Sequence, residues 1–375
     1  MVEVIPVQSK AELERFIRVP MRLMADEPNY IAPLMFERRE ALSPKTNPLF
    51  QHAEHQFFLA RRDGRDVGRI SAQIDHLAKF EPGVPTGLFG MIAAEDDPEV
   101  FAALFAAAEE WLRARDRKQV LGPFNLSIGE EVGLLIDGFD SPPMFMMPHD
   151  PRWTARRIEE QGYVKAKDVY AYINEDGFRF SDQVERRLAR GLPAGVTVRH
   201  AEMKHLDREV RIVADIVNDA WSDNWGGLSL TEAETKHLGE SLGLVLIPEW
   251  VWFYEIDGEP AAFIILLPDL NNAIRDLNGK LLPFGAIKML WRLKMQPIRR
   301  GRVPLMGLKK KFARDRRGML APFVLVDQIR REGIKRGIKE GEYSWILEDN
   351  MAMRHILEGL NARIYKTYRV YGKDL

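Results

Sequence analysis

The chain has 375 residues, of which 46% are hydrophobic and 29% are charged, and its formal net charge is −1 at pH 7. This length exceeds one typical hydrophobic core and indicates two domains, and the composition excludes a largely disordered chain. The near-zero charge gives no overall attraction to nucleic acid or anionic lipid, so partners have to be inferred from local patches.

The chain contains no cysteine. Disulfides, thiolate nucleophiles and cysteine-ligated metal sites are therefore excluded, and catalysis has to use oxygen or nitrogen groups. Residues 1–10 lack the apolar core of a signal peptide, and no apolar run reaches the roughly 18 residues of a membrane-spanning helix. We expect a cytoplasmic protein, with peripheral contact with the inner membrane left open.

For the first half we predict a hairpin of strands at 56–61 and 67–74, a third strand at 87–94 and a helix at 95–115. A fourth strand at 119–124, a second helix at 152–161 and a fifth strand at 168–173 follow. Asp63 and Gly64 stand at the bend of the hairpin, where a tight turn requires positive φ. Acidic residues and Pro98 mark the start of the first helix.

The second half repeats this order. After a connector helix at 181–190, we predict a strand at 196–201, helices at 206–221 and 231–242, and a hairpin of strands at 251–256 and 261–266. A strand at 303–308, a helix at 321–336, a strand at 343–347, a helix at 351–359 and a strand at 363–371 follow. Asp257 and Gly258 stand at the bend of its hairpin. Repetition at this length predicts duplicated domains, at 1–180 and 181–375.

A distinctive segment of the second half is the strand at 343–347, which ends in Glu348, Asp349 and Asn350 directly before a helix. This segment resembles a motif of the GNAT superfamily of acyl-CoA N-acyltransferases, in which an asparagine contacts the pantetheine arm of the cofactor. The resemblance implies an α/β fold of two GNAT-like domains in tandem, with mixed central sheets flanked by helices.

The resemblance also extends along nearly the whole chain through short patterns such as Asn47-Pro48, Gly122-Pro123-Phe124-Asn125 and the end at Tyr365–Tyr371. These patterns resemble those of the tandem GNAT group that includes bacterial ceramide synthases. Two features depart from the superfamily: the pyrophosphate loop at Arg314–Ala321 is imperfect, and Leu357 stands where a tyrosine often acts as general acid.

The two halves differ at the helix that would receive the phosphates of the cofactor. In the first half this helix starts at Glu95, Asp96 and Asp97 without a glycine. A helix N-terminus attracts phosphate through its free N–H groups, but three carboxylates repel it. We therefore expect the first domain to be a degenerate copy that binds no cofactor.

In the resembling superfamily, two adjacent strands part, and the pantetheine arm of the thioester adds to one strand edge. The resemblance places this parting between 303–308 and 343–347, with acyl-CoA or an acyl carrier protein thioester as donor. The implied cofactor-binding residues are Leu308, Arg314, Arg316, Arg317, Gly318 and Asn350, with Lys309, Lys310 and Lys311 adding positive charge.

Acyl transfer also needs a base or a water relay that removes a proton from the amine. Glu348, Asp349 and His355 are the nearby candidates. The acidic residues are equally placed to cap the next helix, and a helical histidine is more commonly an ordinary surface or core residue. No metal is expected, since the acidic loop of the first domain lacks a histidine pair and calcium-loop spacing.

Two segments are candidates for contact with the acceptor. The loop of the first domain carries Asn125, Glu130, Glu131 and Asp137, which are suited to hold an amine or hydroxyl in a cleft, although turn chemistry also accounts for them. The insertion at 270–302 interleaves apolar residues, including Trp291, with basic ones. Its residues 281–302 are suited to lie on a membrane or cover a lipid tail, or alternatively to pack on the core.

The leading hypothesis is an acyl-CoA-dependent N-acyltransferase that places a fatty acyl group on a lipid-like, sphingoid-type amine. An aminoacyl-tRNA-dependent transferase of the peptidoglycan type is a second hypothesis, and it requires a larger basic surface. A non-enzymatic regulator that binds a ligand or DNA ranks last, because the sequence shows no helix-turn-helix with a basic recognition helix. Nucleic acid is therefore not an expected partner.

Overall fold

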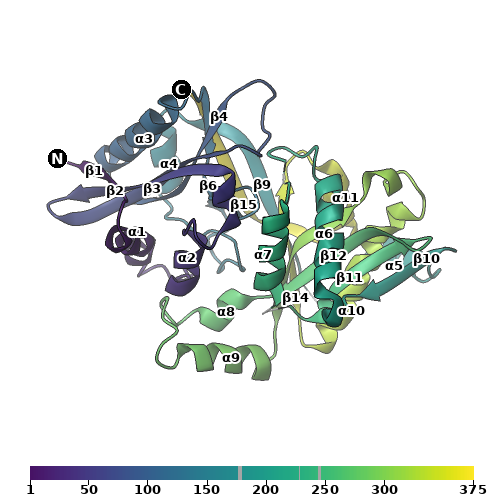
Figure 1. The fold of residues 1–375 in the computed structure, drawn as a ribbon. Coiled ribbons are helices and arrows are strands. Elements are labelled where there is room, and N and C mark those ends of the chain that lie inside the picture. Colours follow the sequence, from purple (N-terminus) through teal and green to yellow (C-terminus); the bar gives the residue numbers. More distant parts are fainter. Residues whose placement is uncertain (176–179, 228, 244–245) are drawn as a thin grey trace. The chain divides into compact units, whose positions relative to one another are not determined.

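The computed structural model describes residues 1–175, 180–227, 229–243 and 246–375 (Figure 1). The chain forms two compact units that interleave along the sequence. The first comprises Met1–Val169, Ile274–Met289 and Lys366–Leu375, and the second comprises Tyr170–Ala273 and Leu290–Tyr365. The duplication expected at 1–180 and 181–375 stays a prediction, because these compact units are defined by contacts and not by sequence repetition.

The first unit contains a mixed sheet whose strands, in sheet order, are β1 (Glu3–Pro6), β2 (Ala53–Arg62), β3 (Arg65–Asp75), β4 (Thr86–Ala94), β5 (Gln119–Gly122) and the end of β15 (Arg363–Asp374). Neighbouring strands are antiparallel except β4 and β5, which are parallel. Its shorter elements and helices are β6 (Phe124–Asn125), β7 (Glu131–Val132), β8 (Leu134–Asp137), α1 (Lys10–Leu23), α2 (Met35–Ala41), α3 (Pro98–Arg113) and α4 (Thr154–Glu159).

Both faces of this sheet are covered because its strands are apolar on both sides. Along β2, Phe57 and Leu59 pack with residues of α1, whereas Phe58 and Ala60 pack with residues of α3. Successive side chains of a strand point to opposite faces, so one apolar run supplies two cores. The sheet therefore lies between α1 and α3.

The second unit contains a mixed sheet in the order β14 (Glu340–Leu347), β13 (Arg300–Leu308), β12 (Glu259–Pro268), β11 (Val251–Ile256) and β10 (Val196–His200). Strand β9 (Val164–Asn174) passes from the first unit into the second. The remaining helices are α5 (Asp182–Leu188), α6 (Leu206–Ala220), α7 (Glu232–Gly243), α8 (Leu270–Ile274), α9 (Gly285–Met295), α10 (Ala321–Lys335) and α11 (Met351–Gly359).

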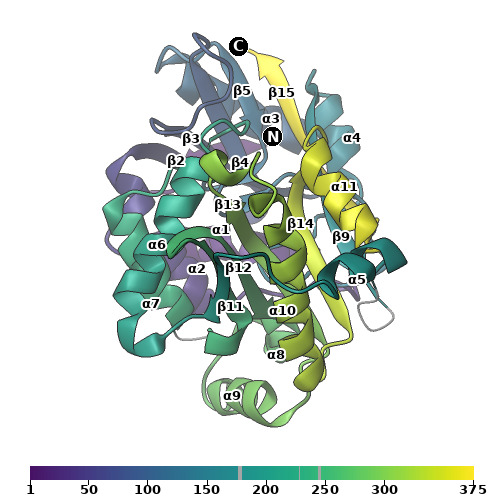
Figure 2. The same cartoon turned by 90° about the vertical axis from the view of Figure 1, so that its right-hand side faces the viewer.

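Helices also cover both faces of the second sheet (Figure 2). Helix α10 packs on β11, β12 and β13 through its buried residues, among them Leu325 and Ile329, and α6 packs on β12 and β13. Strands β13 and β14 are parallel, whereas β12 with β13, β11 with β12 and β10 with β11 are antiparallel. The element order is therefore that of the first unit, with a hairpin, a strand, a helix and a parallel strand.

Both predicted hairpin turns are confirmed. The φ angles are 51° at Asp63 and 76° at Gly64, and 53° at Asp257 and 81° at Gly258. Positive φ at both central residues matches the right-handed twist of the flanking strands. Strand β1 and helices α1 and α2 of the first unit were not predicted from the sequence.

The central position of α10 gives a testable prediction. Leu325 is fully buried on this helix, whereas Ile334 of the same helix is 44% exposed. We expect Leu325→Ala to lower the free energy of unfolding by about 2–5 kcal/mol, through lost burial and the cavity left behind. The matched Ile334→Ala change should cost below about 1 kcal/mol. Urea unfolding measures both, and equal costs would contradict the packing of α10.

Candidate functional site

Strands β13 and β14 part halfway along their length. Their parallel pairs run from Arg300 with Glu340 to Val303 with Tyr343. Strand β13 continues to Leu308 on its other partner, β12, and β14 continues to Leu347, but these ends do not pair with each other, although both lie in the described residues. The parting of these strands is confirmed, and it leaves one edge of β13 open to a ligand that hydrogen-bonds like a strand.

The chain after β13 leads directly to the N-terminus of α10. A turn at Gly318–Leu320 precedes the helix, which begins at Ala321. A Cβ atom at Gly318 would lie 2.0 Å from the carbonyl oxygen of Phe312, so the loop closes on itself only with glycine there. Free N–H groups of a helix N-terminus favour anions. The carboxylate of Asp315 accepts the N–H of Arg317 at 2.7 Å, so an acidic side chain of the loop itself already engages a donor of this turn.

The structure divides the predicted cations into paired and unpaired ones. Acidic side chains hold four of them: Lys309 by Asp215 and Glu259, Lys310 by Asp223, Lys311 by Glu259, and Arg317 by Asp257 and Asp315. Arg314 and Arg316 are exposed, and no ion pair joins either of them to another residue that the structure describes. These two arginines are the cations of the loop that remain available to an anionic ligand.

The predicted residues after β14 mainly shape the start of α11. The side-chain oxygen of Asn350 accepts the N–H of Met353 at 3.1 Å and so caps the helix. The backbone carbonyl of Glu348 accepts a hydrogen bond from Arg354 at 2.7 Å. Asp349 and His355 are exposed, and Glu348 is half-buried. The half-buried carboxylate of Glu348 is therefore the most sheltered of the three predicted base candidates.

A buried ion pair that was not predicted from the sequence lies one residue before the strands part. Arg302 and Glu342 face each other across β13 and β14, both are fully buried, and Nε lies 3.3 Å from Oε1. The Ser344 hydroxyl donates to Glu342 at 2.6 Å and accepts from Arg302 at 2.9 Å. The Tyr365 hydroxyl donates to the other carboxylate oxygen, and the guanidinium lies over the Trp345 ring. The network ties the last paired residues together.

This network gives a second prediction. Glu342→Gln removes the buried carboxylate and leaves Arg302 charged in the interior, so we expect a loss of about 3–5 kcal/mol in the free energy of unfolding. Glu340→Gln is the matched control on the same strand, since Glu340 is 40% exposed where it meets Arg300. Its cost should stay below about 1 kcal/mol in the same urea titration. Similar costs for the two variants would argue against a structural role for the buried pair.

The first unit has an equivalent parting, but its own chain fills the edge. The pairs of β4 with β5 end at Leu88 with Leu121, and β4 continues to Ala94. The predicted substrate residue Asn125 accepts the N–H of Met91 on β4 at 2.6 Å. A Cβ atom at Gly90 would lie 1.8 Å from the Phe124 carbonyl, so the two segments are in direct contact. The strand edge that is open in the second unit is thus engaged here.

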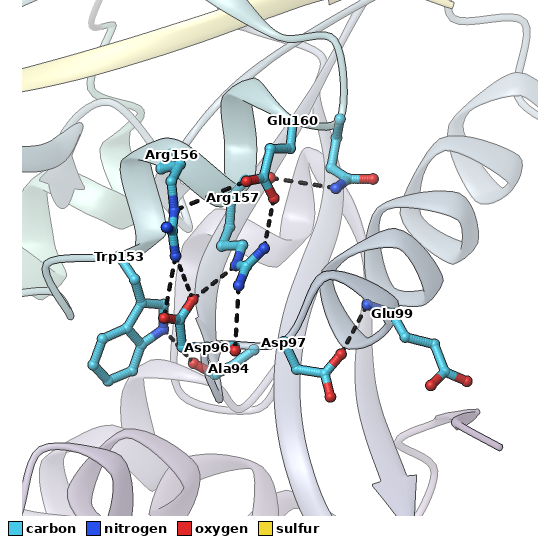
Figure 3. Close-up of polar contacts among 9 residues, drawn as sticks. Ala94, Asp96, Asp97, Glu99, Trp153, Arg156, Arg157 and Glu160 are labelled. Atoms are coloured by element: carbon cyan, nitrogen blue, oxygen red, sulfur yellow. Dashed lines mark hydrogen bonds and ion pairs between the residues drawn. The ribbon is translucent and has the colours of Figure 1, made fainter.

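The start of α3 in the first unit is also engaged by the protein itself. Figure 3 shows Asp97 accepting the N–H of Glu99 at 2.8 Å, which caps the helix. Asp96 accepts from Arg156 at 3.0 Å and from Arg157 at 2.7 Å, both on α4. The carboxylates expected to repel a phosphate therefore form the cap of α3 and an ion-pair cluster with α4.

The structure places some of the predicted substrate residues together and leaves others apart. Asn125 donates to Glu131 at 2.8 Å, and Glu131 lies 3.5 Å from Arg38. Glu130 is half-buried and adds to the negative charge near Arg38. Asp137 is exposed on β8, and Trp291 is 53% exposed on α9. The structure therefore brings Asn125, Glu130 and Glu131 into one polar cluster.

Asp150 extends this cluster and gives a pH prediction. Its carboxyl group accepts the N–H of Leu135, and burial raises its pKa to about 7. The folded state then binds a proton that the unfolded state has released near its ordinary pKa of about 3.9. Stability should therefore fall as the pH rises from about 4 to 7, by up to about 4 kcal/mol.

Asp150→Asn tests this dependence because it keeps an oxygen for Leu135 but cannot ionise. We expect the variant to unfold at higher urea concentration than the parent above pH 7, with a flatter dependence of stability on pH. The exposed Asp137→Asn serves as the control and should retain the slope of the parent. If Asp150→Asn also retains that slope, the carboxyl does not titrate in this range.

Comparison with known proteins agrees with this geometry. No family model matches the sequence. The chain is 55% identical over 373 residues to the bacterial ceramide synthase of Caulobacter vibrioides, covering 99% of this chain and 97% of that protein. It is 43% identical over 368 residues to protein YghO of Escherichia coli, covering 98% and 94%.

Solved structures with little sequence identity share the fold. A tandem GNAT protein from the clavulanic acid biosynthesis pathway matches with a TM-score of 0.58 at 13% identity, over 100% of this chain and 98% of that one. A GCN5-related N-acetyltransferase from Sphaerobacter thermophilus matches with a TM-score of 0.53 at 14% identity, over 100% and 95%. The predicted tandem GNAT fold is confirmed, and the chain belongs to the bacterial ceramide synthase family of acyltransferases.

Proposed function

We propose that the chain transfers a fatty acyl group from the thioester of acyl-CoA to the amino group of a long-chain, sphingoid-type base. The observation that carries this proposal is the end of β13–β14 pairing at Val303 and Tyr343, while both strands continue. An extended pantetheine arm has amide groups that hydrogen-bond to such an edge as a short strand does. Family membership supports the reaction class, and the name of the relative from Caulobacter vibrioides supports the acceptor class.

The reaction needs only groups that this edge and its surroundings supply. The amine attacks the thioester carbonyl, its C–N bond forms as the C–S bond breaks, and the sulfur leaves as a thiolate that takes up a proton. Pro304 follows Val303 and has no N–H, so a backbone N–H group of β13 beyond Pro304 would stabilise the charge that develops on the carbonyl oxygen. A base removes the amine proton, and Glu348 is the first candidate, followed by Asp349 and His355.

The donor is proposed to extend from this edge to the start of α10. The phosphates of CoA would meet Arg314 and Arg316, with Gly318 allowing the close turn and Leu308 marking the end of the open edge. Asn350 lies at the end of the neighbouring strand and is proposed to contact the arm. Arg317 is instead a positioning residue, since Asp257 and Asp315 already hold it.

The acceptor is proposed to meet the polar cluster of Asn125, Glu130 and Glu131. A substrate ammonium group carries positive charge and three donors, which suit the carboxylates and amide of this cluster. Asp137 and Trp291 are further proposed contacts for the acceptor.

Because the chain contains no cysteine, released CoA can be measured directly with a thiol reagent. A thiol reagent such as Ellman's reagent reacts with the CoA released and has no thiol to react with in the protein. We expect the purified chain to release CoA from a long-chain acyl-CoA when a sphingoid base is added, together with the N-acyl product in a mass spectrum. Release of no CoA with any long-chain amine, or transfer only from aminoacyl-tRNA, would overturn the proposal.

The two unpaired arginines give a prediction for the donor site. We expect Arg314→Ala and Arg316→Ala each to raise KM for acyl-CoA by about 5–10-fold, because each removes one charge-assisted contact with phosphate. Arg190→Ala, which removes an exposed arginine of the same unit, is the control and should leave KM unchanged. An acyl-pantetheine donor lacks the nucleotide phosphates, so its KM should be insensitive to both variants. Equal effects on the two donors would place the phosphates elsewhere.

A further inference from the structure

A second surface of the molecule stands out by its exposed apolar side chains. Fifteen large apolar side chains are exposed among the described residues, and six of them lie within residues 282–295. Their exposed fractions are 82% at Leu282, 74% at Phe284, 66% at Ile287, 50% at Leu290, 53% at Trp291 and 70% at Met295. Such a concentration marks an interaction surface, because isolated exposed apolar residues would be scattered over the chain.

The arrangement of these residues along α9 (Gly285–Met295) makes them one continuous stripe. Phe284 directly precedes the helix, and Ile287, Trp291 and Met295 follow it at intervals of three, four and four residues. Side chains at these intervals lie above one another on a single helical face. The stripe is therefore a helix face that carries no covering layer of its own.

The surroundings of the stripe are strongly basic. Six lysine or arginine residues and one aspartate lie between residues 275 and 299, whereas the whole chain has a net charge of −1. Arg275, Lys280 and Arg299 are exposed, and no ion pair joins them to other described residues. Lys288 pairs with Asp276, the one acid of the segment, and the side chain of Lys294 lies outside the described residues. The segment thus combines an apolar face with uncompensated positive charge.

The charge pattern distinguishes between the occupants that could cover this face. A second copy of the chain in a symmetric contact would bring the same cations against one another, which is unfavourable. An anionic bilayer offers a hydrocarbon layer to the stripe and phosphate groups to the cations, and tryptophan is favoured at such an interface. No helix in the described part of the chain is long and apolar enough to cross a membrane. The 11-residue α9 suits a position in the plane of the interface.

We propose that Leu282–Met295 is a docking surface for an anionic membrane. The apolar face of α9 inserts at the boundary between headgroups and acyl chains, and Arg275, Lys280 and Arg299 meet lipid phosphates. This surface stands independently of the acyl-transfer proposal, since it rests on exposure and charge outside the parted strands.

The test is flotation of the full chain with vesicles that contain no substrate. We expect the chain to float with phosphatidylcholine vesicles that contain phosphatidylglycerol, to bind pure phosphatidylcholine more weakly, and to lose binding as salt is raised. The double variant Phe284→Asp with Ile287→Asp should reduce the affinity at least about tenfold. Ile334→Asp is the matched control, an exposed apolar residue on helix α10, and should bind as the parent does.

Two results would overturn the proposal that Leu282–Met295 docks on a membrane. One is equal vesicle binding by the double variant and the parent. The other is that the parent chain does not bind vesicles but forms dimers in analytical ultracentrifugation, whereas the double variant is monomeric. This result would assign the apolar face of α9 to a contact with a second copy of the chain. Release of CoA with a water-soluble amine, measured on the parent, separates this failure from failure of the proposed acyl transfer.

Discussion

The functional geometry of the second unit depends on where one hydrogen-bond ladder stops. Two parallel strands in a sheet interior normally pair along their shared length, since unpaired backbone groups are costly when buried. Strands β13 and β14 pair for four residues and then part. The buried ion pair of Arg302 with Glu342 lies one residue before this point and favours the register that brings the two charges together. The end of the ladder thus lies directly beside a buried and fully hydrogen-bonded pair of charges.

The two units show one framework used in two ways. Each has a strand that continues beyond its parallel partner and a helix that starts just after that strand. In the first unit, Asn125 occupies the strand edge, and Asp96 ties the start of α3 to two arginines. In the second, Arg314 and Arg316 have no ion-pair partner in the described residues. A few contacts therefore distinguish the first unit, where Asn125 engages the β4 edge, from the second, where β13 and β14 part and two of the six loop cations have no ion pair in the described residues.

Turn residues, helix caps and hydrophobic periodicity predicted most of the helices and strands, but they did not predict contacts between residues far apart in the sequence. The Asp-Gly turns and the parting of β13 from β14 were predicted, since turn chemistry and the family resemblance mark them in the sequence. Helix α1 was missed although Ser9 and Glu12 form its capping box, and Pro20 inside the helix obscures the periodicity. The Arg302–Glu342 pair was missed because charged residues in a strand normally face solvent. Their burial depends on partners that no short window contains.

The last strand has a consequence for how the molecule assembles. Residues 366–375 belong to the first unit, where Tyr371 pairs with Gly122 of β5 across a sequence separation of 249 residues. Chains fold as they leave the ribosome, and long-range pairing is slow because a large loop has to close first. The edge of β5 therefore stays unpaired until residues 366–375 have been synthesised. Deletion of residues 366–375 would therefore remove the strand that pairs with β5 and destabilise the first unit, most of which is synthesised earlier.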